Sequence, residues 1–308
     1  MKKIFQVYCL SLLMCIQICY AYEKNIAINQ YVSHVALDAA YHGFIDGIEK
    51  EGLKDKIKII FGNAQGNLGN SIQISKQHAS LMPDFMVSIS SLSTQTNYKV
   101  KNDKTILAFL AVSDPNALSL NDSKNIIGVT DNPPIVELIE KTLLILPKVK
   151  TIGVIYNSGE INSVNAVETL EKTLKLYSIA LKKVTITNSN DIKNAMNKLI
   201  GMVEAIYLPQ DNSVISALNN IVNIANTNNV PLIANDPTLV KEGIFMALGS
   251  NYYESGIQLA NMIAQIIDGT KLEQPIQQAK VKEFKINFDL AKKLNITIPE
   301  NTIGQVSP

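Results

Sequence analysis

Short runs of apolar, often β-branched residues alternate along the chain with longer segments in which apolar residues recur at helical spacing. Asn25–Tyr31 has the pattern of a strand, and Ala36–Glu51 has that of a helix, which Gly52 ends. Further strand patterns in the first half lie at Lys56–Phe61, Phe85–Ile89, Thr105–Val112 and Ile126–Thr130. Nearly continuous apolar strands that alternate with helices predict a parallel sheet covered on both faces.

The same alternation begins again in the second half of the chain. Strand patterns lie at Thr151–Tyr156, Ala180–Ile186, Ala205–Leu208, Val230–Ala234 and Phe245–Leu248. We therefore predict an α/β fold of two doubly wound parallel-sheet lobes joined by a hinge. The helix Tyr252–Asp268 is expected to return to the first lobe. The predicted N-terminal lobe comprises residues 22–131 plus about 245–275, and the C-terminal lobe residues 132–244 plus about 276–308.

Residues 1–21 have the layout of a secretory signal peptide. Lys2 and Lys3 precede an apolar stretch at positions 4–18, and Cys19 and Ala21 then place small residues at the two positions that signal peptidase reads. The stretch is short for a membrane span, which takes about 20 apolar residues. We therefore expect cleavage near Ala21 and export to the periplasm.

Cysteine usage and charge narrow the class of protein further. All three cysteines lie within residues 1–21, so the mature chain would contain neither disulfides nor cysteine metal sites. Met14 and Ile18 precede Cys15 and Cys19, where a lipoprotein signal has a small residue, so we expect no lipid anchor. The net charge is +1, without basic blocks or a second apolar run. We expect a soluble monomer that binds no nucleic acid.

Polar residues follow the predicted strands, at the end of the sheet where open parallel sheets bind ligands. These segments are rich in Asn, Gln, Ser, Thr and Asp, and their only basic residue is His34. Such a set suits a zwitterion: the helix start Ser90–Thr94 offers donors to a carboxylate, and Asp211 and Asp236 offer partners to an ammonium. Each residue alone is equally explained as a helix cap or a turn.

Sequence motifs of catalysis are absent. The three histidines, His34, His42 and His78, do not have metal-binding spacing. The sequence contains no phosphate-binding glycine loop and no nucleophile elbow. We therefore expect a binding protein rather than an enzyme, with no cofactor and no metal. An exported enzyme with two Rossmann-like lobes, such as a glycosyltransferase, stays as an alternative.

Motifs along the whole mature chain resemble the ABC-transporter solute-binding family whose better-known members take tryptophan, phenylalanine or tyrosine. They occur in the family's order: His34–Asp38, Gly43–Gly47, Asn63–Gly66, Val112–Pro115, Ile152–Asn157 with Glu160, Asn162 and Ser163, Asn188–Asp191, Ala205–Pro209 with Asp211 and Asn212, Asn235 and Asp236, Tyr252–Glu254, Ala291–Leu294 and Ile296–Pro299. The resemblance implies a type-I periplasmic binding fold, an amino-acid ligand and an ABC permease as partner. A sensory binding protein that docks on a receptor or kinase is the alternative.

The resemblance also implies ligand contacts at particular positions. Carried over position by position, it points to Gln65, to Ser90, Ser91, Ser93 and Thr94 of the Ser90–Thr94 segment, to Asn157, to Asp211 and to Asp236. An aromatic ligand needs an apolar or aromatic wall, for which Tyr31 and Tyr252 stand at the ends of predicted elements. Ser158 and Gln210 depart from the family pattern beside this site, which leaves the choice of amino acid open.

Overall fold

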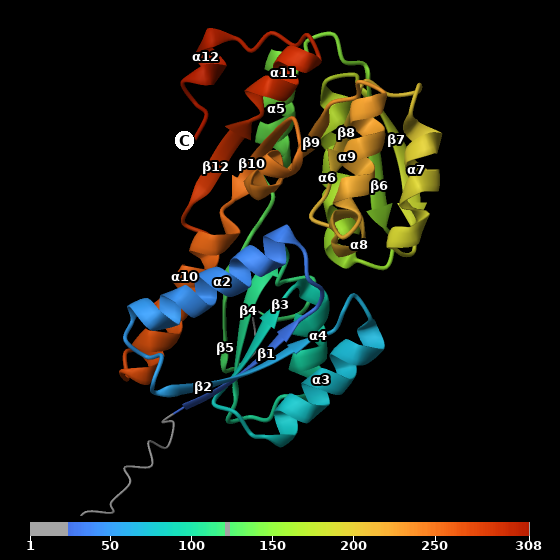
Figure 1. The fold of residues 1–308 in the computed structure, drawn as a ribbon. Coiled ribbons are helices and arrows are strands. Elements are labelled where there is room, and N and C mark those ends of the chain that lie inside the picture. Colours follow the sequence, from blue (N-terminus) through green and yellow to red (C-terminus); the bar gives the residue numbers. More distant parts are fainter. Residues whose placement is uncertain (1–23, 121–123, 308) are drawn as a thin grey trace, which may run out of the picture.

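The computed structural model describes residues 24–120 and 124–307, so the predicted signal peptide at 1–21 lies outside the described residues. Two α/β lobes are stacked end to end (Figure 1). The first lobe contains β1 (Lys24–Gln30), α2 (Val35–Lys50), β2 (Ile57–Asn63), α3 (Leu68–Ser80), β3 (Phe85–Ile89), α4 (Ser91–Val100), β4 (Ile106–Val112), β5 (Ile126–Thr130), α10 (Tyr252–Ile267) and β11 (Ile276–Gln278).

The second lobe is built in the same way. Its elements are α5 (Ile135–Ile145), β6 (Thr151–Asn157), α6 (Ile161–Leu176), β7 (Ala180–Ile186), η1 (Ser189–Asp191), α7 (Ile192–Leu199), β8 (Ala205–Leu208), α8 (Asn212–Ile215), α9 (Leu218–Thr227), β9 (Leu232–Ala234), η2 (Pro237–Glu242), β10 (Met246–Ser250), β12 (Lys282–Ile286), α11 (Phe288–Lys293) and α12 (Glu300–Ile303).

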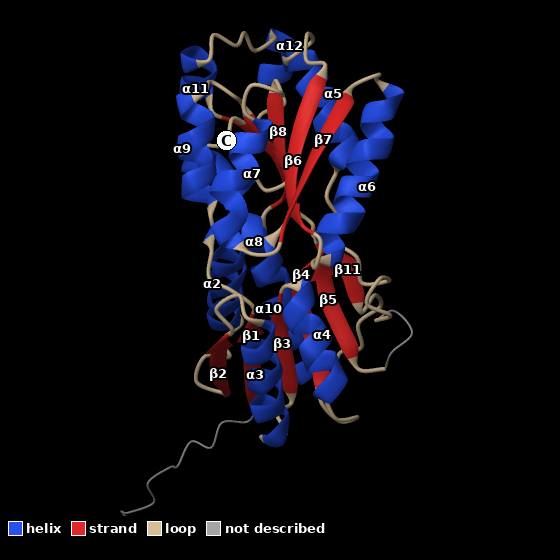
Figure 2. Cartoon of the chain, turned by 90° about the vertical axis from the view of Figure 1, so that its right-hand side faces the viewer, coloured by secondary structure: helices blue, strands red, loops and turns tan. Residues whose placement is uncertain are grey.

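The strand orders are β11-β5-β4-β3-β1-β2 and β12-β10-β9-β8-β6-β7. The described pairs are parallel, apart from the antiparallel pair of β10 and β12. Helices cover both faces of each sheet (Figure 2). The predicted α/β class with two doubly wound lobes is confirmed. In each sheet the chain reverses its direction of growth beside the first strand, between β1 and β3 and between β6 and β8.

The predicted lobe boundaries near residues 245 and 276 are wrong. β10 was assigned to the first lobe but lies in the second sheet, where Met246 pairs with both Ile233 and Ile286. β11 was assigned to the second lobe but lies in the first sheet, where Ile276 pairs with Gly128. A three-residue strand has too little hydrophobic pattern to be read from sequence. The chain therefore crosses between the lobes after β5, after β10 and after β11.

The helix α10 returns to the first lobe, as predicted, and packs against α2 (Figure 1). Glycines allow the two helices to approach closely. A Cβ atom at Gly43 would lie 1.9 Å from the carbonyl oxygen of Tyr253, and one at Gly256 would lie 2.3 Å from that of Ala40. Because real Cβ atoms do not come so near to backbone, this helix pair requires glycine at both positions.

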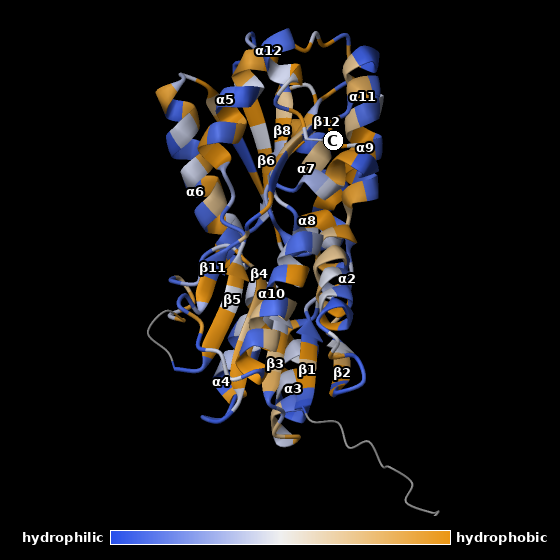
Figure 3. Cartoon of the chain, turned by 90° about the vertical axis from the view of Figure 1, so that its left-hand side faces the viewer, coloured by the Kyte–Doolittle hydropathy of each residue, from blue (hydrophilic) through white to orange (hydrophobic). Residues whose placement is uncertain are grey.

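The apolar residues of the strands form the interior of each lobe (Figure 3). On one face of the first sheet, Ile28 packs with Phe44 of α2 and Leu259 of α10. The second lobe has two clusters of buried apolar residues, one that contains Met196 and one that contains Tyr207. Each sheet is thus held rigidly by its own core, which fixes where its strands end.

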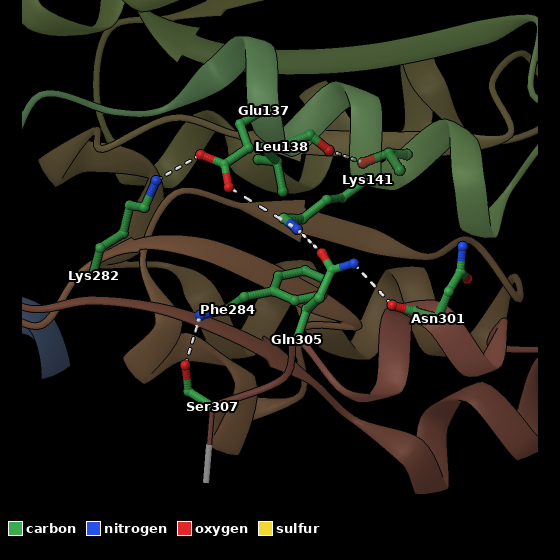
Figure 4. A network of polar contacts seen from close by, with 9 residues as sticks. Glu137, Leu138, Lys141, Lys282, Phe284, Asn301, Gln305 and Ser307 are labelled. Carbon is green, nitrogen blue, oxygen red and sulfur yellow. Dashed lines mark hydrogen bonds and ion pairs between the residues drawn. The ribbon is translucent and has the colours of Figure 1, made fainter.

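The C-terminal segment contacts the second lobe through hydrogen bonds (Figure 4). Lys141 of α5 donates to Oε1 of Gln305 at 2.5 Å, and its ammonium lies 4.7 Å from the ring centroid of Phe284. Lys282 of β12 forms an ion pair with Glu137 of α5 at 2.6 Å. Gln305 and Ser307 therefore lie against α5 and β12 of the second lobe.

Candidate functional site

Helix N-termini from both lobes meet between the two sheets. In the first lobe, Ser90 caps α4 by accepting from the Leu92 amide at 3.3 Å, and His34 caps α2 by accepting from the Leu37 amide at 3.5 Å. In the second lobe, Asp211 caps α8. These residues follow β3, β1 and β8, the strands that flank the point of reversal in each sheet. Ligands of open α/β sheets bind at such positions.

A pocket with an empty volume of about 450 Å³ lies at this meeting point. Among the described residues, no Lys or Arg lines it. Its ionisable residues are His34, Asp131, Asp211, Asp236 and Tyr252; its other polar residues are Ser90, Ser91, Ser113, Asn162, Gln210, Asn212 and Asn235; and its apolar residues are Ala36, Leu37, Ala111, Leu208, Pro209, Ile215 and Leu239.

Three acceptor atoms in the wall are buried and have no hydrogen-bond partner among the described residues. They are Asp131 Oδ1, Asp236 Oδ2 and Asn162 Oδ1. The second oxygen of each carboxylate is occupied: Tyr252 donates its hydroxyl to Asp131 Oδ2, and Thr238 donates its amide and hydroxyl to Asp236 Oδ1 at 2.9 and 2.6 Å. A buried acceptor without a partner is costly, so this wall is prepared for a ligand that donates hydrogen bonds.

Neither Asp131 nor Asp236 forms an ion pair with a Lys or Arg among the described residues. Burial first, and then the negative charges of Asp131 and Glu283, raise the pKa of Asp236 to about 7 against the hydrogen bonds from Thr238, which lower it. Burial also raises the pKa of Asp131. A cation bound between the two carboxylates would reverse these shifts, because an opposite charge favours the ionised form.

His34 is a neutral donor in this wall. Burial lowers the pKa of His34 to about 4, so its imidazole is uncharged at neutral pH. Since Nδ1 accepts from the Leu37 amide, the proton lies on Nε2, which is 3.4 Å from Asn212 Oδ1. The sequence showed only that His34 lacks metal-binding spacing. Only its place after the first strand pointed to the binding site, because a histidine N-cap leaves no recognisable sequence pattern.

Asp211 was predicted to hold an ammonium, and it lines the pocket, but its carboxylate oxygens hold the backbone. Oδ1 accepts from the Val214 amide at 3.0 Å, and Oδ2 accepts from the Asn157 amide at 2.6 Å. Glu160 lies beside it, and burial together with the charge of Asp211 raises the pKa of Glu160. Asp211 therefore shapes the turn between β8 and α8, whereas Asp131 and Asp236 offer free oxygens.

Half of the predicted contact residues line the pocket. Ser90, Ser91, Asp211, Asp236 and Tyr252 do so. Ser90 and Ser91 stand at the start of α4, and Tyr252 stands at the start of α10. Tyr252 does not act as a bare aromatic wall, because its hydroxyl is committed to Asp131.

The other five predicted residues do not line it: Gln65 is exposed, and the polar groups of the other four are used elsewhere. Gln65 lies in the exposed turn after β2 with φ at 54°. Ser93 donates to the Ile89 carbonyl at 2.9 Å, and Thr94 donates to that of Ser90 at 2.8 Å. Asn157 donates to Ser213 Oγ at 2.8 Å, and Tyr31 donates to the Gly66 carbonyl at 2.9 Å.

Sequence reasoning missed Asp131, Ser113 and Asn162. Asp131 follows β5, where the chain leaves the first lobe, and it was treated as a lobe boundary rather than as a strand end. Ser113 was noted after its strand, and Asn162 within the family motifs, but neither was selected as a contact. The available signal was position: each lies within a few residues of the end of a parallel strand.

Hydrogen bonds join the lobes across the pocket. Ser113 donates to Gln210 Oε1 at 3.1 Å, and Gln210 Nε2 donates to the Asp131 carbonyl at 3.4 Å. At the rim, Asn165 donates to Asp114 Oδ2 at 3.1 Å. The structure is therefore a form in which the lobes are closed on each other.

Two other features are absent from the part of the chain that the structure describes. Across residues 24–120 and 124–307, no group of three or more His, Cys, Asp or Glu side chains is arranged to hold a metal ion. None of the helices described in these ranges is long and apolar enough to cross a membrane.

Known proteins resemble this chain over nearly its whole length. The Tyrosine-binding protein of Clostridioides difficile is 32% identical over 282 residues, which is 89% of this chain and 81% of that protein. An ABC domain from Streptococcus pneumonia, in complex with L-Trp, superposes with a TM-score of 0.87 at 27% identity, covering 92% of this chain and 99% of that one.

A third relative has a different conformation. The ligand-free, open structure of a substrate binding protein with adhesive properties from Clostridium difficile gives a TM-score of 0.68 at 32% identity, covering 92% of this chain and 98% of that one. The family model described as ABC transporter substrate binding protein matches residues 25–306, and it confirms the family that the sequence motifs indicated. The chain belongs to the family of ABC transporter substrate-binding proteins.

Proposed function

We propose that this protein captures a free aromatic amino acid between its two lobes and delivers it to an ABC permease. The observation that carries the proposal is the set of three buried, unpartnered acceptors, Asp131 Oδ1, Asp236 Oδ2 and Asn162 Oδ1. A primary ammonium has three N–H donors, one for each of these acceptors, and its positive charge suits a position beside the two carboxylates.

The carboxylate of the ligand has its own partners in the first lobe. The start of α4 at Ser90 and Ser91 and the start of α2 beside Leu37 both line the pocket. The first N–H groups of a helix lack intrahelical partners, and they attract anions. The amino-acid head group thus binds with its positive end between Asp131 and Asp236 and its negative end at the two helices.

The apolar part of the wall suits the side chain of the ligand. Leu37, Leu208, Ile215 and Leu239 contribute aliphatic surface, and Tyr252 contributes an aromatic ring. Relatives named for tyrosine and solved with L-Trp support an aromatic side chain, because both cover nearly the whole of this chain. The higher TM-score with the L-Trp complex than with the ligand-free, open chain supports a closed form that encloses its ligand.

We place this activity outside the cytoplasm, after removal of the signal peptide, and without catalysis. In such a system lobe closure is the signal that a permease reads. The alternative, a sensory partner, uses the same pocket and the same closure.

Calorimetry tests the ligand. We expect tyrosine, tryptophan or phenylalanine to bind more tightly than alanine, leucine or glutamate. The matching amine without the carboxylate, and the matching acid without the ammonium, should each bind far more weakly than the amino acid. Tightest binding of an aliphatic or acidic amino acid would refute the aromatic ligand, and binding of none of the amino acids would refute the proposed function.

A further inference from the structure

Asn212 of the second lobe reaches across the pocket to two helix caps of the first. Its Nδ2 donates to Ser90 Oγ at 3.2 Å, and its Oδ1 lies 3.4 Å from His34 Nε2, which carries the proton. On its own lobe, Nδ2 also donates to Glu160 Oε2 at 2.6 Å. One side chain therefore joins the N-termini of α2 and α4 to the second sheet.

These contacts use both amide protons of Asn212. A side-chain amide has two N–H donors, and Ser90 and Glu160 take one each. Glu160 holds the residue firmly in place, because it also accepts from the Asn212 backbone amide at 3.0 Å and from the Ser213 amide and hydroxyl, each at 3.1 Å. Although Asn212 lines the pocket, it has no proton left to give a ligand.

The hydrogen bond from Asn212 also decides which way the Ser90 hydroxyl points. Ser90 Oγ accepts from the Leu92 amide at 3.3 Å and from Asn212 Nδ2 at 3.2 Å, and these two bonds use both of its lone pairs. Only its proton remains, and Ser90 lines the pocket.

The Ser90 backbone is fixed as well. Its φ is 108°, a region that favours glycine, and its amide donates to the Leu110 carbonyl at 3.0 Å. A residue other than glycine is strained at such a φ, and strained backbone of this kind is concentrated at functional sites. The Ser90 hydroxyl is therefore a donor whose direction is fixed once the lobes have closed.

We propose that Asn212 is a positioning residue: it holds the closed lobes together and orients the Ser90 hydroxyl as a donor to the ligand carboxylate. The proposal rests on the proposed amino-acid ligand, but it concerns a residue that acts through Ser90 rather than on the ligand. In the open form the bonds to Ser90 and His34 are broken, so the residue influences release more than capture.

A double-mutant cycle with stopped-flow kinetics tests this role. Asn212→Ala and Ser90→Ala are each expected to raise the dissociation rate of the preferred amino acid roughly tenfold, the worth of one hydrogen bond to a charged group, with little change in the association rate. The double variant should dissociate more slowly than the product of the two single effects predicts, because the part of the Asn212 effect that passes through Ser90 is lost only once. Ser213→Ala is the matched control, since it removes a Glu160 contact without touching the first lobe.

Asn212→Leu, which keeps the side-chain size, replaces Asn212→Ala should the latter fail to fold. Thermal melting of each ligand-free variant verifies that the lobes are intact. Wild-type dissociation rates in both Asn212 variants, or losses that simply add in the double variant, would overturn the positioning role. Failure of the wild-type protein itself to bind any amino acid would instead overturn the proposed function, so the two failures are distinguishable.

Discussion

The hydroxyl of Tyr252 donates a hydrogen bond to Oδ2 of Asp131 and so ties the first residue of α10 to the end of β5. Both residues lie where the chain crosses between the lobes. Burial raises the pKa of Asp131, and the hydrogen bond from Tyr252 opposes this rise. Tyr252 thus helps to keep a carboxylate charged in the wall, with Oδ1 left for a ligand.

Replacing Tyr252 by Phe should weaken binding of every amino acid by a similar amount. The ring remains, but Asp131 loses a partner and becomes harder to ionise, at a cost of about 1–3 kcal/mol. Calorimetry with tyrosine, tryptophan and alanine measures it. Tyr253→Phe is the control, because the Tyr253 hydroxyl donates to Asp46 at the surface. A loss confined to aromatic ligands would show that Tyr252 acts through its contact with the ligand side chain instead.

Replacing Asp236 by Asn should abolish most of the affinity. The change keeps the shape of the side chain but removes the charge beside the ammonium, and loss of a buried charge partner costs about 2–5 kcal/mol. Asp268→Asn, at the exposed end of α10, removes the same charge far from the pocket and serves as the control. Unchanged affinity in the Asp236 variant, measured by calorimetry, would exclude this residue as the ammonium partner.

The pH dependence of binding follows from the same residue. The pKa of Asp236 in the ligand-free protein is about 7, so its carboxyl is increasingly protonated below pH 7. An ammonium needs the ionised form, and affinity should therefore fall up to about tenfold for each pH unit below 7. Binding near pH 7 should therefore release protons. Calorimetry in buffers of different ionisation enthalpy measures whether protons are released or taken up. Asp236→Asn should remove that part of the pH dependence.

The stability of the ligand-free protein should also depend on pH through Asp236, and it should fall as pH rises. The pKa of Asp236 is raised from 3.8 to about 7 by folding, so the folded state binds the proton more tightly than the unfolded chain. Its contribution to the free energy of unfolding is full below pH 3.8 and is lost as pH rises through 7. The rise in Tm caused by the ligand should consequently be larger at pH 8 than at pH 6. An equal rise at both values would contradict the link between Asp236 and the ammonium.

The fold was predictable because it depends on long, repeated patterns. Apolar strands such as Phe85–Ile89 and amphipathic helices such as Val35–Lys50 leave a strong period in the sequence. The three-residue strand β11 leaves almost none, so its assignment to the wrong lobe has a physical cause. Pairing with β5 is a property of the folded chain rather than of residues 276–278.

The site was predictable only in part, because the same residue types serve as caps and as ligand contacts. Ser93 and Thr94 stand in the same helix start as Ser91, but their side chains turn back to bond the chain. Asp211 and Asp236 both follow strands and both cap the next helix. Only Asp236 keeps a buried oxygen without a partner, and no pattern in the sequence records that difference.

The contact between α2 and α10 gives the last prediction, which links stability to the site. Gly43→Ala would place a methyl group 1.9 Å from the Tyr253 carbonyl oxygen, so the helices must separate. Overpacking of this kind costs about 1–3 kcal/mol, which a lower Tm and a lower urea midpoint would report. Gly304→Ala is the control, because nothing lies within 4 Å of a Cβ atom there and φ is −65°.

The Gly43 change should also weaken ligand binding, although this residue does not line the pocket. Tyr253 follows Tyr252 directly, so a displaced α10 carries the Tyr252 hydroxyl away from Asp131. We expect an affinity loss that approaches, but does not exceed, that of Tyr252→Phe, since both changes act on the same hydrogen bond. In the double variant the two losses should be less than additive. Unchanged affinity together with a lowered Tm would mean that α10 holds Tyr252 in place independently of its packing on α2.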